Sequence, residues 1–70
     1  MRRFLVVIEK SKKNFSAYSP DLPGCAATGR TAAEAEKNMH AAIAFHIEGL
    51  IEDKQPIPKP HAIAEYMAVG

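Results

Sequence analysis

The sequence predicts one α+β domain spanning residues 1–70, with the element order β-β-β-α-β. Three observations lead to this prediction: strand-like segments fill roughly the first 30 residues, a long helical pattern follows, and a proline-rich linker precedes a last alternating segment. Seventy residues are enough for only one small domain. Strands that pair with their sequence neighbours and pack against a separate helix define the α+β class.

The first predicted strand is Phe4–Ile8, an unbroken run of apolar, largely β-branched residues. Such a run is typical of a strand that is covered on both faces. The polar residues 11–14 predict a hairpin turn, in which Asn14 can adopt the left-handed conformation. Residues 15–19 then alternate between apolar and polar side chains, which predicts a second strand.

Residues 20–24, with the sequence Pro-Asp-Leu-Pro-Gly, predict a structured loop between the second and third strands. The two prolines lack the N–H group that a sheet requires, and Gly24 can adopt a positive φ. Residues 25–28 follow as a short third strand, which ends at Gly29.

A capping box at Thr31 and Glu34 predicts the start of a helix, because each side chain can bind a free amide of the first turn. The helix is expected to run from Ala32 to about Asp53. We expect close packing against the sheet to account for Gly49, which is unfavourable within a helix. Helical spacing places a predicted core stripe on one side: Ala35, Met39, Ala42, Ile43, His46 and Leu50.

Three alternating prolines at positions 56, 58 and 60 predict an extended connector after the helix. A last strand is expected at Ala62–Val69. Ile63, Met67 and Val69 would lie on one of its faces and Tyr66 on the other.

Composition narrows the class of function. Nine basic and eight acidic side chains give a net charge of +1, which does not indicate a general nucleic-acid-binding surface. The basic residues near the N-terminus are interpreted as a solvated hairpin rather than a phosphate site. A single cysteine, Cys25, excludes an internal disulfide, and no run approaches the roughly 20 apolar residues of a membrane span. We therefore expect a cytoplasmic protein.

The segment Phe15–Gly29, with the sequence FSAYSPDLPGCAATG, resembles the hallmark segment of HicB-like antitoxins. The capping box, the helix segment Phe45–Leu50 and the segment Ile57–Pro60 follow in the order typical of that family. Asn14 stands where a glycine is common, and Ser19 where an apolar residue is common. The resemblance covers Phe4–Val69.

This resemblance implies a degenerate RNase H-like fold and a protein partner. The partner would be a HicA-type toxin that cleaves mRNA, and the antitoxin would mask its active site. Many relatives carry a further C-terminal DNA-binding domain, whereas this sequence stops after the last predicted strand. We therefore expect no direct nucleic-acid binding from this chain. We also expect no cofactor.

An enzymatic function is the alternative, in the form of a remnant RNase H-like nuclease. Such a site needs several carboxylates around two metal ions. The candidates are Glu9, Asp21 and Glu65, and their positions in the sequence do not ensure that the three carboxylates meet at one site. A thiolate–imidazole pair of Cys25 with a histidine has no support in the spacing. His40 and His46 also lack the i, i+4 spacing of a helical zinc pair. We expect no catalytic residue and no metal ligand.

A binding function is predicted because the first strand has more apolar surface than one helix can cover. One helix can cover only one face of the sheet, yet the first strand is apolar on both faces. We therefore expect a homodimer or a higher even assembly in addition to the toxin; an oligomeric domain without a toxin is the other alternative. The candidate partner-binding residues are Ala41, Ala44, Ile47, Ile51 and Asp21. The alternative for the four helix residues is ordinary apolar surface, and the alternative for Asp21 is a side chain that caps its own turn.

Overall fold

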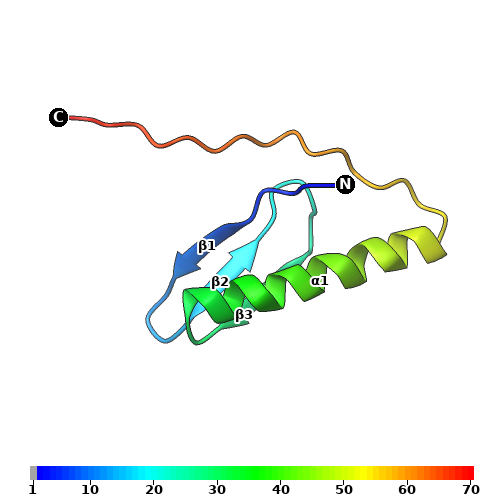
Figure 1. The fold of residues 1–70 in the computed structure, drawn as a ribbon, viewed down its shortest axis with the longest axis horizontal. Coiled ribbons are helices and arrows are strands. Elements are labelled where there is room, and N and C mark those ends of the chain that lie inside the picture. The colour runs from blue at the N-terminus through cyan, green and yellow to red at the C-terminus, as the bar shows by residue number, and fades with distance from the viewer. Residues whose placement is uncertain (1) are drawn as a thin grey trace.

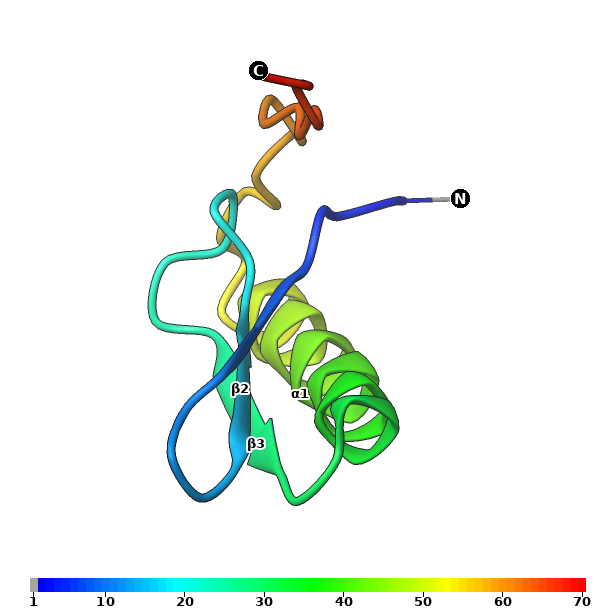
Figure 2. The ribbon, with the colours of Figure 1, turned by 90° about the vertical axis from the view of Figure 1, so that its left-hand side faces the viewer.

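A computed structural model describes residues 2–70 as an antiparallel sheet with one long helix packed against one of its faces (Figures 1 and 2). The strands are β1 (Val7–Lys10), β2 (Phe15–Tyr18) and β3 (Ala26–Gly29), and the helix is α1 (Ala32–Glu52). Their order in the sheet is β1-β2-β3, and both pairs are antiparallel. The α+β class, the first three strands and the helix are therefore confirmed.

The first hairpin shows one confirmed prediction and one correction. The turn forms as expected, since the Ser11 N–H donates to the Asn14 carbonyl at 2.8 Å. The first strand, however, begins at Val7 rather than Phe4. The partner of Val7 is Tyr18, the last residue of β2 before the chain turns away at Pro20. Residues 4–6 therefore have no strand to pair with inside this chain.

The loop between β2 and β3 has the structure that its composition predicts. The Leu22 N–H donates to the Ser19 carbonyl, and the Cys25 N–H donates to the Leu22 carbonyl, both at 3.1 Å. Gly24 adopts a φ of +82°, which a residue with a side chain rarely tolerates. The side chain of Leu22 is completely buried, so the loop contributes directly to the core.

The Thr31 half of the capping box at the start of α1 is confirmed, whereas the Glu34 carboxylate binds the amide of the residue before the N-cap. The Glu34 N–H donates to the Thr31 hydroxyl at 3.0 Å, and the Arg30 N–H donates to a Glu34 carboxylate oxygen at 2.9 Å. At the other end, Asp53 is the C-cap residue, close to the predicted boundary. The N-terminal boundary thus follows from local side-chain chemistry, whereas backbone hydrogen bonds close the C-terminal end.

The core lies under the first half of α1, because the helix is much longer than the strands. Its 21 residues extend about 31 Å, whereas a four-residue strand extends only about 13 Å. His46 and Leu50, predicted for the core, are therefore only partly buried. Gly49 has open space where a Cβ would lie, so the expected close packing there is wrong. The buried apolar residues are Ala17, Leu22, Cys25, Ala35 and Met39.

The predicted last strand does not form in this chain. Residues 55–70 contain no strand, and the segment extends away from the sheet (Figures 1 and 2). Ile63 and Met67 are each 84% exposed, and Tyr66 and Val69 are more exposed still. A strand requires a neighbour for its backbone groups, and this segment lies beside none. The element order is thus β-β-β-α, and the fourth strand of the expected RNase H-like sheet is absent from the described residues.

A buried hydroxyl in the loop leads to a prediction about stability. Ser19 is 3% exposed, and its Oγ has no hydrogen-bond partner within residues 2–70. Because an unsatisfied buried polar group costs about 1–3 kcal/mol, Ser19→Ala is expected to raise the free energy of unfolding by about 1 kcal/mol. Urea denaturation measures this change. Ser11→Ala is the matched control and should lower stability, since the Ser11 hydroxyl donates to Asn14. A loss of stability in Ser19→Ala would contradict the prediction.

Candidate functional site

Exposed apolar side chains gather on the second half of α1, where the helix extends past the strands. Phe45 is 79% exposed and Ile51 is 58% exposed, and the small residues Ala41, at the middle of the helix, and Ala44 are exposed beside them. Three of the predicted partner-binding residues are thus at the surface. Ile47 does not face outward as expected, because its side chain is partly buried and packs against the core.

Phe45 is the residue of this surface that sequence reasoning missed. It lies outside the predicted core stripe, and a phenylalanine in the middle of a helix is ordinarily assigned to a core. The available signal was its spacing of four residues from Ala41, which places the two side chains on the same side of the helix.

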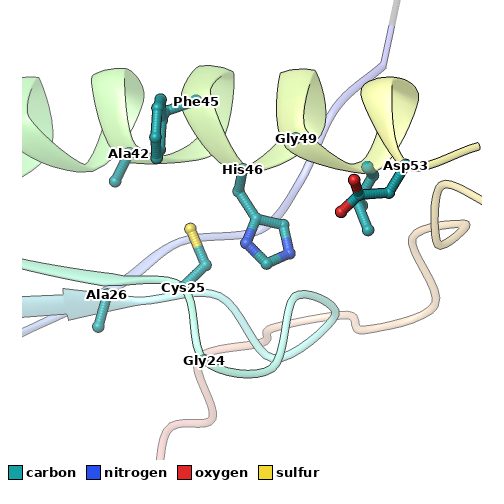
Figure 3. Close-up of a pocket in the computed structure, with 9 residues that line it drawn as sticks. Gly24, Cys25, Ala26, Ala42, Phe45, His46, Gly49 and Asp53 are labelled. Carbon is teal, nitrogen blue, oxygen red and sulfur yellow. The ribbon is translucent and has the colours of Figure 1, made fainter. Parts of the chain in front are cut away.

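An open groove lies beside Phe45, between α1 and the residues that lead into β3 (Figure 3). We call it the β3-side groove; its volume is about 470 Å³. Figure 3 shows Phe45, His46 and Asp53 along the helix and Cys25 on the opposite wall. The lining residues are Gly24, Cys25, Ala26, Ala42, Phe45, His46, Gly49, Leu50 and Asp53.

The β3-side groove contains one thiol and one imidazole. The side chains of Cys25 and His46 both point into the space between helix and strand (Figure 3). Burial raises the pKa of the Cys25 thiol above its usual value, so the thiol stays protonated at neutral pH. A protonated thiol is a poor nucleophile and acts as a small apolar surface.

A second groove lies on the opposite side of the helix, between α1 and the N-terminal segment. We call it the β1-side groove; its volume is about 290 Å³. Its apolar floor combines residues that precede β1 with residues of the helix. It is lined by Arg2, Phe4, Val6, Glu36, His40, Ile43 and Ala44. His40 and His46 therefore lie in different grooves.

The three acidic candidates have different positions. Both carboxylate oxygens of Asp21 accept a hydrogen bond from the Ala62 N–H, at 3.3 and 3.2 Å, which neither expected role of Asp21 anticipated. Glu9 is exposed on β1, and Glu65 is exposed on the C-terminal segment. Within residues 2–70, no group of three or more histidine, cysteine or acidic side chains could hold a metal ion. In the same part of the chain, no helix is long and apolar enough to span a bilayer.

Comparison with known proteins places this geometry in a family. A family model described as the HicB-like antitoxin of bacterial toxin–antitoxin systems matches residues 4–69. The chain belongs to this family. The family resemblance inferred from the loop and helix motifs is thereby confirmed. The match also includes two segments of this HicB-like antitoxin that form no strand here, residues 4–6 and 62–69.

Several relatives of this HicB-like antitoxin are known from sequence. A 14.9 kDa protein of Haemophilus phage HP1 is 42% identical over 89% of the chain, which spans only 47% of the phage protein. A UPF0150 protein of Synechocystis is 36% identical over 94% of the chain and 85% of its own length. A UPF0150 protein of Thermoplasma acidophilum is 34% identical over 86% of the chain and 88% of its own length.

The fold is also similar to a solved structure. A chain from a HicA3 and HicB3 toxin–antitoxin complex superimposes with a TM-score of 0.68 and 35% sequence identity. The match covers 84% of this HicB-like antitoxin and 72% of that chain. The three-stranded sheet and its helix are thus an arrangement that also occurs in a toxin–antitoxin complex.

Proposed function

We propose that this chain is a non-catalytic antitoxin that binds a HicA-type, mRNA-cleaving toxin and masks its active site. The observation that carries this proposal is the likeness to a chain from a HicA3 and HicB3 complex, at 35% identity over 84% of the sequence. Membership of the antitoxin family agrees with it.

The surface of the second half of α1 suits such a partner. Protein interfaces are typically centred on a few aromatic or other large side chains beside well-formed pockets. Phe45 is an exposed aromatic side chain at the rim of the β3-side groove, and Ile51 extends the apolar surface along the helix. The regular helix holds these side chains in place before binding, which limits the entropy lost in the complex.

Masking requires no reactive group on the antitoxin. Burial raises the pKa of the Cys25 thiol, and the carboxylate of Asp21 is engaged with the backbone of Ala62. Inhibition would therefore result from a rigid apolar surface that excludes RNA from the toxin.

The test combines this protein with the toxin encoded beside it or, if there is none, with a purified HicA-type ribonuclease. We expect the two proteins to co-purify and RNA cleavage to be lost once the antitoxin is in molar excess. The antitoxin alone, incubated with the same RNA and Mg²⁺, serves as the control and should leave the RNA intact. Cleavage that continues unchanged at high antitoxin excess would rule out the proposed function. Cleavage by the antitoxin alone would favour the nuclease alternative.

A further inference from the structure

The C-terminal segment 62–69 has the features of a strand without having a partner. Its side chains Ile63, Met67 and Val69 share one face of an extended strand with Glu65, and Tyr66 lies on the other face. All four large hydrophobic side chains are almost fully exposed to solvent in the isolated chain. Exposure of this much apolar surface in one short segment indicates a contact that a single chain does not provide.

The chain's own sheet does not take up this segment. Pro56, Pro58 and Pro60 cannot donate to a strand as the segment returns toward the N-terminal residues. Pro60 and Ala62 lie beside residues 3–6, where they line a common pocket, but the Ala62 N–H donates to Asp21 instead of to a strand. Beyond Ala62 the segment leads away from the sheet in both views (Figures 1 and 2).

The free edge of β1 is the place where such a strand fits. At the other edge of the sheet, the Asn38 side chain donates to the Thr28 carbonyl of β3 at 2.8 Å and so occupies part of that edge. No comparable side-chain hydrogen bond reaches residues 3–10 within the described chain, and residues 3–6 belong to no ladder. An open edge of this kind favours the addition of another strand.

The two segments also match in length, shape and charge. Residues 3–10 and residues 62–69 are both eight residues long. The β1-side groove, with Phe4, Val6 and Ile43 in its lining, offers an apolar surface to one face of an added strand. The segment from residue 2 to 13 has five basic and one acidic side chain, whereas residues 60–70 have one acidic and no Lys or Arg.

We propose that residues 62–69 of each chain pair with the β1 edge of a second copy, which does the same in return. The occupant is a second copy because the segment is anchored by Asp21 near its own N-terminal residues and then leaves its own sheet. The exchange is reciprocal, as a two-fold dimer requires, and it gives each copy a fourth strand. Two exchanged strands bury an area on the order of the 1,200–2,000 Å² of stable dimers. This inference is independent of toxin binding.

The test compares two double variants of the full-length protein by analytical ultracentrifugation over a concentration series. The wild-type protein is expected to sediment at twice its chain mass of 7.6 kDa. Ile63→Asp with Met67→Asp places two charges on the proposed buried face and is expected to raise the dimer dissociation constant about 100-fold or more. Ala32→Asp with Ala33→Asp is the matched control, because it adds the same two charges at exposed positions of the helix that line none of the grooves. It should leave the dimer intact.

Nuclear magnetic resonance distinguishes exchange from closure within one chain. In a mixture of isotope-labelled and unlabelled protein, filtered NOEs between residues 62–69 and residues 4–8 are expected to connect different copies. The proposal is overturned if the wild-type protein is a monomer throughout, if the tail variant remains dimeric, or if these NOEs arise only within one chain.

Discussion

Gly29→Ala is expected to lower the free energy of unfolding by about 3 kcal/mol. Gly29 is buried where β3 meets the first turn of α1, and a Cβ there would lie 2.8 Å from the Glu34 carbonyl carbon and 2.9 Å from the Ala35 Cα. These are backbone atoms of a capped helix end, so they cannot move aside as a flexible side chain could. Overpacking usually costs about 1–3 kcal/mol, and contact with backbone places this change at the upper end.

Such a loss is large for a chain of this size. Seventy residues provide only about 4–10 kcal/mol of stability in total, so the midpoint of thermal unfolding should fall by more than 10 °C. Gly49→Ala is the matched control, because a Cβ at this helical position meets nothing within 4 Å. It is expected to raise stability by about 0.5–1 kcal/mol through helix propensity. Both variants should be measured at one protein concentration. A Gly29→Ala protein as stable as the wild type would show that α1 can shift away from β3.

The features that could be predicted from the sequence depend on neighbouring residues. The Thr31 half of the capping box, the Ser11–Asn14 turn and the positive φ of Gly24 all involve residues within a few positions of one another. In each case the side chain or backbone geometry is specified locally, and the structure agrees with the prediction. The core residues Ala35 and Met39 followed from helical spacing in the same way.

The predictions that are wrong concern partners distant in the sequence. Phe4–Val6 have the composition of a strand, but a ladder forms only as far as the partner strand extends, and β2 ends at Tyr18. Residues 62–69 alternate as a strand does, yet alternation does not reveal whether a neighbour lies within the same chain. Helical spacing placed His46 and Leu50 in the core, but only the relative lengths of helix and strands show that the sheet ends before them.

The candidate site was partly predictable for the same reason. Ala41, Ala44 and Ile51 were identified because they lie opposite a core stripe, and their exposure is confirmed. Phe45 was not identified, because the β3-side groove beside it is formed with residues 24–26. Its spacing of four residues from Ala41 places it on the exposed side of the helix, but the groove itself depends on residues distant in the sequence.

Phe45→Asp is expected to weaken binding of the proposed HicA-type toxin by about 30-fold to 1,000-fold, a prediction that rests on the proposed function. Truncating a central aromatic residue of an interface typically costs about 2–4 kcal/mol, which corresponds to this range. Aspartate also adds a charge to an apolar groove whose rim already carries Asp53. Because Phe45 is 79% exposed, the fold itself should tolerate the change, and far-UV circular dichroism should be unchanged.

Isothermal titration calorimetry with the purified toxin measures this loss of affinity. Ala33→Asp is the matched control, because it adds the same charge at an exposed position of α1 that lines none of the described grooves. The control should bind within about threefold of the wild type, as surface substitutions usually change free energies by less than about 0.5 kcal/mol. If Phe45→Asp also binds within this limit while the wild type inhibits the toxin, the docking surface lies elsewhere on the antitoxin. We expect the Ile63→Asp, Met67→Asp variant to retain toxin binding that Phe45→Asp loses. This result would show that toxin binding depends on the helix surface and not on the proposed exchange of strands.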